Sequence, residues 1–229
     1  MPSRPLVIAH RGSHGAGIIE NTLAAFQQAV ALGADMIELD VRRTADDELV
    51  VFHDYKVGRE EVVSLTLEAL RERARTDVPR LTEVLEWASG RIGLDVELKE
   101  DGYATRVAEL LAGFADGGGE PLVTSFLDPV LAQLERLAAP LRCGLLIGFT
   151  AEGAVGRARE CGAGSLVLQA KLASEALLSE AVDAGLEILV WDFMADTAGH
   201  RELLRDSRIA GVITDDVRGA LAHRRSADS

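Results

Sequence analysis

Short apolar segments alternate with amphipathic ones along nearly the whole chain. The apolar segments are rich in Val, Ile and Leu and predict buried strands. The segments between them repeat apolar residues at helical spacing, which predicts helices with one buried face. The predicted strands cover residues 5–10, 36–41, 49–54, 92–99, 121–126, 143–149, 165–170, 186–193 and 211–216. The predicted helices cover residues 21–33, 65–75, 81–89, 103–114, 128–139, 151–161, 173–184 and 197–206.

This order of elements predicts an α/β fold. A helical segment lies in seven of the eight gaps between the nine predicted strands, which is typical of parallel βαβ units. For 229 residues the best fit is a single (β/α)8 TIM barrel, and a doubly wound sheet is the alternative. No Pro- or Ser-rich linker divides the chain, so we expect one domain over residues 1–229.

The gap without a helix separates strands 36–41 and 49–54. We expect a hairpin there, with a two-residue turn centred on Asp46 and Asp47. This register would set Asp40 opposite His53.

Two predicted strands carry acidic residues where a buried parallel strand should be apolar. Strand 36–41 alternates apolar residues with Glu38 and Asp40, and strand 92–99 does the same with Asp95 and Glu97. In a barrel, the apolar faces would pack on helices and the carboxylates would point inward. A solvated edge strand is the simpler alternative for one such strand, but it fits two strands poorly.

Carboxylates inside a barrel need a partner, because an unpaired buried charge costs several kcal/mol. Glu38, Asp40 and Glu97 would offer oxygen ligands, which suit Mg²⁺ or Ca²⁺, with Mn²⁺ also compatible, better than zinc. Asp95 is the weaker candidate because it lies one pleat repeat deeper in its strand.

Other polar and aromatic residues fall at the ends of predicted strands, where barrel proteins place their function. Two histidines beside a carboxylate cluster can act as base and acid near neutral pH. The residues at these ends are His10, Arg11, His53, Lys99, Phe126 and Trp191.

The composition limits the classes of partner and the cellular location that we expect for the protein. The net charge of −13 argues against nucleic acid, and an anionic substrate would need a locally positive site. No run of 18 apolar residues predicts a membrane span, and the first apolar run is too short for a signal peptide. Cys143 and Cys161 read as buried thiols of a reducing compartment, so we expect a cytoplasmic protein. The sequence does not indicate an oligomeric state.

Three motifs resemble those of the glycerophosphodiester phosphodiesterase family. The opening HRG and ENT appear at residues 10–12 and 20–22. The second motif appears as ELDVRRTADDELVVFHD over residues 38–54, and the third, E-x-K, appears at 97–99. Weaker similarities are TSF at 124–126, Trp191 and GVITD at 211–215.

The resemblance implies a barrel that hydrolyses glycerophosphodiesters to glycerol 3-phosphate and an alcohol. It implies one divalent cation on Glu38, Asp40 and Glu97, with His10 and His53 as general acid and base. Arg11 and Lys99 would hold the phosphate of this small-molecule substrate, and Phe126 and Trp191 would line its pocket.

The sequence departs from the family pattern at three places. Ile19 stands where the family has proline, and Trp191 is followed by Asp-Phe-Met. The family's inserted subdomain after the third strand is reduced here to a small insertion, which leaves the head-group preference open. His14, in the first loop, has no family role that we can assign.

Three other functional hypotheses remain open at this point. One is a cyclising phospholipase of the sphingomyelinase D kind, and another is a Schiff-base aldolase built on Lys99. The third is a barrel that binds phosphodiesters without turning them over.

Overall fold

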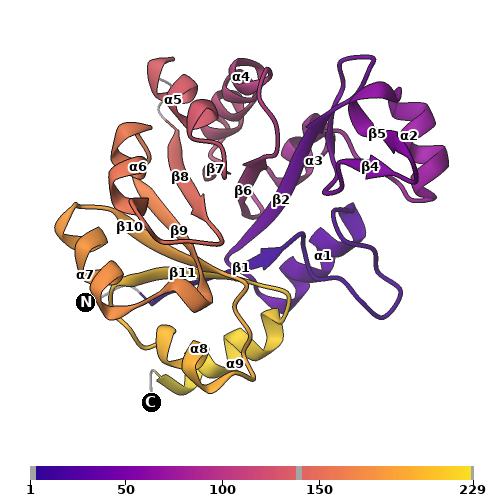
Figure 1. The fold of residues 1–229 in the computed structure, drawn as a ribbon. Helices are drawn as coiled ribbons and strands as arrows, with labels where there is room; N and C mark the ends of the chain where they lie inside the picture. Colours follow the sequence, from indigo (N-terminus) through magenta and orange to yellow (C-terminus); the bar gives the residue numbers. More distant parts are fainter. Residues whose placement is uncertain (1–3, 138–140, 228–229) are drawn as a thin grey trace.

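Eight parallel strands close into a barrel in the computed structural model, which describes residues 4–137 and 141–227 (Figure 1). The barrel closes because β1 pairs with both β2 and β11. Its strands, in neighbouring order, are β1 (Leu6–His10), β2 (Met36–Arg43), β6 (Gly93–Leu98), β7 (Pro121–Ser125), β8 (Arg142–Ile147), β9 (Ser165–Gln169), β10 (Glu187–Trp191) and β11 (Ile209–Thr214). The predicted (β/α)8 barrel is therefore confirmed.

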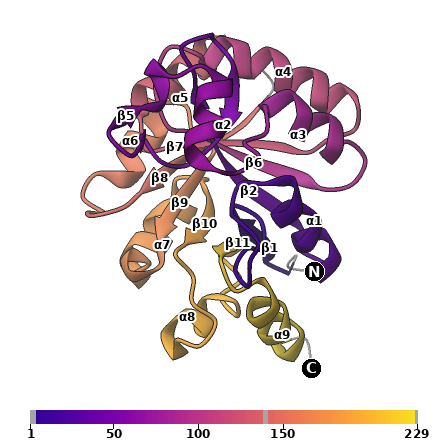
Figure 2. The same cartoon turned by 90° about the vertical axis from the view of Figure 1, so that its right-hand side faces the viewer.

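Helices surround the barrel (Figures 1 and 2). They are α1 (Leu23–Leu32), α2 (Leu67–Ala74), α3 (Leu81–Ala88), α4 (Ala104–Asp116), α5 (Asp128–Arg136), α6 (Ala154–Glu160), α7 (Glu175–Asp183), α8 (Ala198–Leu203) and α9 (Val217–Ala227). The sequence analysis did not predict α9, which packs against β1 and α1 and lies below them in Figure 1. The last two residues of the helix predicted at 128–139 lie outside the described residues. No helix in the described ranges is long and apolar enough to cross a membrane.

The two faces of β2 and β6 separate as predicted. Their apolar residues, such as Ile37 and Val96, pack with the helices in one large core. A second apolar layer fills the barrel interior from Met36 and residues on six other strands. Because Glu38 and Asp40 share a strand face with Met36, they stand above this layer, toward the carboxyl end of the barrel.

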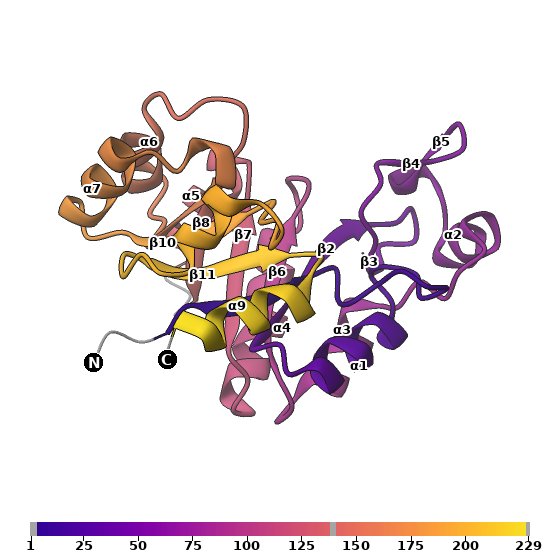
Figure 3. The ribbon, with the colours of Figure 1, turned by 90° about the horizontal axis from the view of Figure 1, so that it is seen from below.

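A small insertion separates β2 from α3 and extends to one side of the barrel (Figure 3). Its part after residue 54 is the small insertion that the sequence predicted. It contains β3 (Leu49–Val51), the short hairpin β4 (Lys56–Val57) and β5 (Glu60–Glu61), the 3₁₀ turn Val62–Ser64, and α2. The insertion has an apolar core of its own: Val50, Val62, Leu65, Leu67, Leu70 and Val78.

The predicted register of the β2–β3 hairpin is wrong by one residue. Val41 pairs with Val51, so Asp40 lies beside Phe52 and not His53, and the Phe52 amide donates to the Asp40 carbonyl at 2.9 Å. The loop has three residues, closed by Thr44 and Glu48, with Asp47 at a φ of 61°. Asp46 in this loop accepts from the Leu67 amide at 3.0 Å, which ties the longer turn to the start of α2.

The first helix lies within the range predicted for it, 21–33, with Thr22 and Gly33 as its caps. The Thr22 hydroxyl accepts from the Ala25 amide at 3.3 Å, and Gly33 ends α1 in a left-handed conformation. The helix predicted at 128–139 starts at Asp128, which is the first residue of α5 and not its cap, and the Asp128 carboxylate pairs with Arg157.

Gly12 lets the chain leave β1 tightly against α1. Its φ is +81°, and a Cβ there would lie 2.7 Å from the backbone carbon of Ala25. The chain passes so close that only glycine fits.

Gly12→Ala should therefore lower the free energy of unfolding by about 2–4 kcal/mol, from left-handed strain plus a backbone overlap. Urea denaturation measures this. Gly15→Ala is the matched control, since Gly15 has a φ of +99° and open space around it. Equal losses in both variants would show that the close approach of Gly12 to Ala25 costs nothing.

Candidate active site

A cavity of about 200 Å³ opens at the carboxyl ends of the barrel strands. It brings together the residues that the sequence singled out, from β1, β2, β6, β7, β10 and the segment after β3. The lining includes His10, Arg11, Glu38, His53, Glu97, Lys99, Thr124, Phe126 and Trp191. Asp40 does not line the cavity but contacts Arg11 and Lys99 directly below it.

Three carboxylates form a buried cluster at this cavity, with Glu38 and Glu97 in its lining and Asp40 outside it. Strand register puts Glu38 beside His10 and Asp40 beside Glu97. One oxygen from each of Glu38, Asp40 and Glu97 lies within 4.8 Å of the others, and the three residues are 3%, 0% and 7% exposed. Their oxygens converge as ligands of a hard cation would.

Asp40 is the best compensated member of the cluster. Lys99 Nζ lies 3.0 Å from its Oδ1, Arg11 Nε lies 3.2 Å from Oδ2, and the Asn21 amide donates to Oδ2 at 2.7 Å. Burial alone would raise the pKa of Asp40, but Lys99 and Arg11 outweigh burial and lower it. Asp40 is therefore ionised.

Glu38 is the least compensated member. Burial, then the charges of Asp40 and Glu97, raise the pKa of Glu38 well above its usual value. The Arg11 amide donates to Oε2 at 2.9 Å, but Oε1 has no hydrogen-bond partner within the described ranges. Burial also raises the pKa of Glu97. A buried oxygen without a donor, facing two more carboxylates, fits a divalent cation.

Asp95 lies deeper, as predicted, and outside this set of ligands. Its Oδ1 accepts from the Thr124 hydroxyl at 2.8 Å, while Oδ2 has no partner in the part of the chain described here. Burial raises the pKa of Asp95 to about 7. The folded protein thus binds this proton more tightly than the unfolded chain does.

Because folding raises the pKa of Asp95, the ionisation of this residue lowers the free energy of unfolding as pH rises from about 4 through about 7. The total loss is roughly 4 kcal/mol. Asp95→Asn should abolish this loss and keep the Thr124 contact. Thermal unfolding at pH 5 and pH 8 tests the prediction, and the variant's advantage should be larger at pH 8. An advantage that is the same at both pH values would contradict it.

Each candidate catalytic histidine has a carboxylate on Nδ1. Asp215 Oδ1 lies 2.7 Å from His10 Nδ1, and Asp54 Oδ1 lies 2.9 Å from His53 Nδ1. A carboxylate at Nδ1 favours the proton there and leaves Nε2 for the cavity. Consistently, His10 Nε2 lies on the cluster side of the ring, 3.9 Å from Glu38.

Sequence reasoning assigned no role to Asp215 or His14, which the structure brings to His10. His14 Nε2 lies 3.3 Å from the same Asp215 oxygen that contacts His10. Bonds from both histidines lower the pKa of Asp215, and Asp215 raises the pKa of His14. Asp215 directly follows β11. The expectation that functional residues lie at the carboxyl ends of barrel strands would therefore have identified it.

The candidate phosphate-binding cations are anchored by carboxylates. Arg11 Nη1 donates to Glu20 at 2.8 Å, and Lys99 Nζ donates to Glu97 at 2.7 Å. Burial opposes the charge of Lys99, but Asp40 and Glu97 outweigh burial and raise its pKa. A firmly protonated lysine is a poor amine nucleophile, which argues against the Schiff-base aldolase.

Two aromatic rings form an apolar wall of the cavity. Phe126 and Trp191 meet edge to face, with centroids 5.7 Å apart. The indole of Trp191 donates to the Ile147 carbonyl at 3.1 Å, which fixes the wall.

A second cavity of about 340 Å³ lies on the other side of His53. The small insertion supplies much of its wall through Val57, Arg73 and Val78, and Ile19 and Glu20 of the first loop complete it. His53 lines both cavities.

The fold and the site define a class: a (β/α)8 barrel with a buried carboxylate cluster and two histidines at the carboxyl ends of its strands. The chain belongs to the glycerophosphoryl diester phosphodiesterase family, which its sequence matches over residues 10–218.

Known relatives agree with this family. A glycerophosphodiester phosphodiesterase of Caldanaerobacter subterraneus is 34% identical over 163 residues, which are 62% of this chain and 67% of that protein. The solved enzyme of Thermotoga maritima has a TM-score of 0.81 at 27% identity, covering 96% of this chain and 98% of that one. A phosphodiesterase of Oleispira antarctica, solved with its product sn-glycerol-3-phosphate, shares the fold with a TM-score of 0.81 at 24% identity, over 99% of this chain and 98% of its own. The chain spans about half to two thirds of the length of the first curated relatives it matches, 52% and 67%.

Proposed function

We propose that the protein hydrolyses glycerophosphodiesters to glycerol 3-phosphate and an alcohol, using one divalent cation and two histidines. One observation carries the proposal: His10 and His53, each with a carboxylate on Nδ1, line a single cavity with the carboxylate cluster. Family membership and the product bound to the Oleispira antarctica protein support the substrate class.

Glu38, Asp40 and Glu97 would hold the cation, and Mg²⁺ or Ca²⁺ suits three carboxylates best, with Mn²⁺ also compatible. When bound, the cation supplies a Lewis acid for a non-bridging phosphoryl oxygen. It would also balance the excess negative charge, because four buried carboxylates (Glu38, Asp40, Asp95, Glu97) face two cations (Arg11, Lys99).

The histidines would move the protons. The Nε2 atom of one takes a proton from the attacking oxygen, and the Nε2 atom of the other returns one to the leaving alcohol. Asp215 and Asp54 keep the rings oriented and stabilise the protonated forms. Arg11 and Lys99 would turn toward the remaining phosphate charge from their carboxylate partners.

The two cavities would bind different parts of the substrate, one on each side of His53. The glycerol part would lie against Phe126 and Trp191 in the smaller cavity, and the alcohol would extend into the larger one beside the insertion. The acidic residues Glu20, Asp54 and Asp77 line that cavity, and its two basic residues, Lys56 and Arg73, each pair with a glutamate outside it. The remaining negative charge suits an amino alcohol such as choline or ethanolamine.

Phosphorus NMR of glycerophosphocholine and glycerophosphoethanolamine incubated with the full chain tests the proposal. We expect glycerol 3-phosphate to appear with Mg²⁺ or Ca²⁺ and to be absent with EDTA. A cyclic phosphate that persists would instead support the cyclising phospholipase chemistry. Unchanged substrate with every metal would overturn the proposal and leave a binding barrel.

We also propose a cytoplasmic location, as expected from the two cysteines. Cys143 and Cys161 are free and buried. Unpaired thiols are typical of proteins from reducing compartments.

A further inference from the structure

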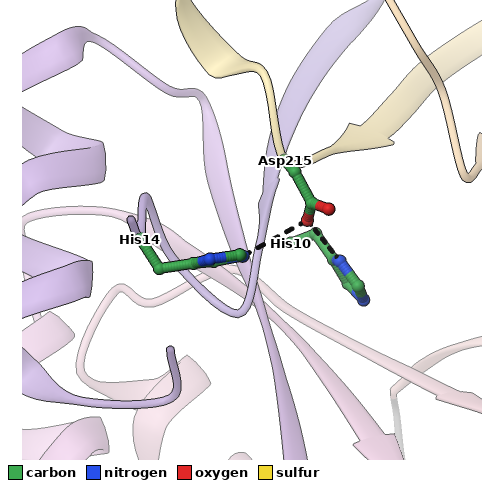
Figure 4. A group of neighbouring side chains, drawn as sticks. All are labelled: His10, His14 and Asp215. Atoms are coloured by element: carbon green, nitrogen blue, oxygen red, sulfur yellow. Dashed lines mark hydrogen bonds and ion pairs between the residues drawn. The ribbon is translucent and has the colours of Figure 1, made fainter. Parts of the chain in front are cut away.

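His14 is a titratable group beside the candidate site that the proposed chemistry does not use. It lies in the loop after β1, and Asp215 lies after β11. In Figure 4, His10 and His14 point at the same carboxylate from two sides. The three side chains offer two imidazoles and one carboxylate within 4.8 Å of one another.

We propose that His10, His14 and Asp215 form a second metal site, selective for Zn²⁺ and similar transition-metal ions, and that its occupation inhibits the enzyme by taking His10. Binding of the metal stands on this cluster alone. Inhibition also rests on the proposed function.

The distances fit a tetrahedral ion after a small adjustment. Ligand atoms about 2.0–2.1 Å from Zn²⁺ are about 3.3 Å apart along the edges of a tetrahedron. His14 Nε2 already lies 3.3 Å from Asp215 Oδ1, and His10 Nδ1 lies 2.7 Å from it. Side-chain rotation of Asp215, which is exposed, can widen the shorter edge.

The ligand types separate this site from the carboxylate cluster. Imidazole suits Zn²⁺ and related transition metals, whereas Glu38, Asp40 and Glu97 offer only the oxygens preferred by Mg²⁺ and Ca²⁺. The cluster of His10, His14 and Asp215 is half-buried to exposed, so an ion can enter and water can complete its coordination. The two ions would therefore bind at adjacent sites, on either side of His10.

Metal at Nδ1 would stop His10 from moving protons. A neutral ring that binds the ion through Nδ1 must carry its single proton on Nε2, so metal binding shifts the proton from Nδ1 to Nε2 by exchange with solvent; an imidazolium would in addition release its second proton. That proton then faces Glu38, where the proposed reaction needs a nitrogen able to exchange protons with the substrate. Zn²⁺ would thus inhibit even when the carboxylate cluster is saturated with Mg²⁺.

Direct binding tests the site without relying on activity. Zn²⁺ is titrated into the full chain in excess Mg²⁺ against a chromogenic zinc indicator, and Co²⁺ absorption reports the coordination geometry. We expect one tight Zn²⁺ per chain, a tetrahedral Co²⁺ spectrum, and affinity at least about tenfold weaker in His14→Gln and Asp215→Asn. The control, His223→Gln on α9, should bind as the wild type does. Equal affinity in His14→Gln and the wild type would overturn the site.

Inhibition is then measured with glycerophosphocholine in excess Mg²⁺. His14→Gln should keep the basal rate and need at least about tenfold more Zn²⁺ for half-inhibition. Zinc that binds through His14 without lowering the rate would overturn the inhibition. If the chain shows no phosphodiesterase activity before zinc is added, the proposed function fails, and the binding experiment alone decides the site.

Discussion

His53→Ala and His10→Ala should each lower kcat by about 10²–10⁴-fold, the contribution expected of a positioned general acid or base. Each histidine has a carboxylate on Nδ1 and lines the cavity that holds the carboxylate cluster. Without the imidazole, either the attacking oxygen keeps its proton or the alcohol leaves without one. The measurement is the initial rate of glycerol 3-phosphate release from glycerophosphocholine in saturating Mg²⁺ or Ca²⁺.

Folding should not explain the loss. The Arg42 guanidinium donates to the backbone carbonyl of His53, at 2.8 Å, and alanine keeps that contact. Thermal unfolding of His53→Ala should therefore match that of the wild type closely. His223→Ala is the control for histidine removal, and its rate should be unchanged. A rate near that of the wild type in either site variant would sink the two-histidine scheme.

Glu38→Gln should lower activity by at least about 100-fold and yet stabilise the metal-free protein by about 1–4 kcal/mol. When ionised, Glu38 is a buried charge that Lys99 and Arg11 leave largely unbalanced, because both contact Asp40. Glutamine can still accept from the Arg11 amide at this position. Stability and activity thus change in opposite directions.

The pH dependence of stability follows from the sign of the shift. The folded pKa of Glu38 is raised, so its cost is absent at low pH and grows as pH rises through that pKa. In EDTA, the advantage of Glu38→Gln over the wild type should therefore be larger at pH 8 than at pH 5. In Mg²⁺ or Ca²⁺ this advantage should become smaller, because metal binding stabilises the wild type more than it stabilises the variant. Thermal unfolding of both proteins at pH 5 and pH 8, each in EDTA and in metal, measures this advantage.

Glu109→Gln is the matched control, since Glu109 is exposed on α4. Its unfolding temperature and its rate should both match those of the wild type. If Glu38→Gln were less stable than the wild type in EDTA at pH 8, Glu38 would not be the uncompensated charge that we describe.

Periodicity predicted the barrel because buried parallel strands and their covering helices are long, repeated and strongly patterned. It also predicted the inward carboxylates, since acidic residues on alternate positions of β2 and β6 break an otherwise apolar pattern. The sequence missed α9, whose helical stretch contains Gly219 and several basic residues. With so few apolar positions, this stretch gives little signal without the tertiary contacts that hold it.

The errors at the site come from contacts between distant parts of the chain. In the β2–β3 loop, Asp46 binds the start of α2, 21 residues away, and no local pattern encodes that bond. The pairing of Asp215 with His10 joins residues 205 positions apart. Strand ends predict which residues face the site, but only barrel closure through β1 and β11 determines which of them touch.

The insertion between β2 and α3 folds around apolar residues that the barrel core does not share. Changes in its length or sequence therefore need not disturb the packing beneath the carboxylate cluster. Since the same insertion forms much of the larger cavity, it can diverge as an exchangeable module. Relatives could acquire different alcohol preferences by remodelling this segment alone, while the proton-transfer and cation-binding residues stay under the separate constraint of the barrel.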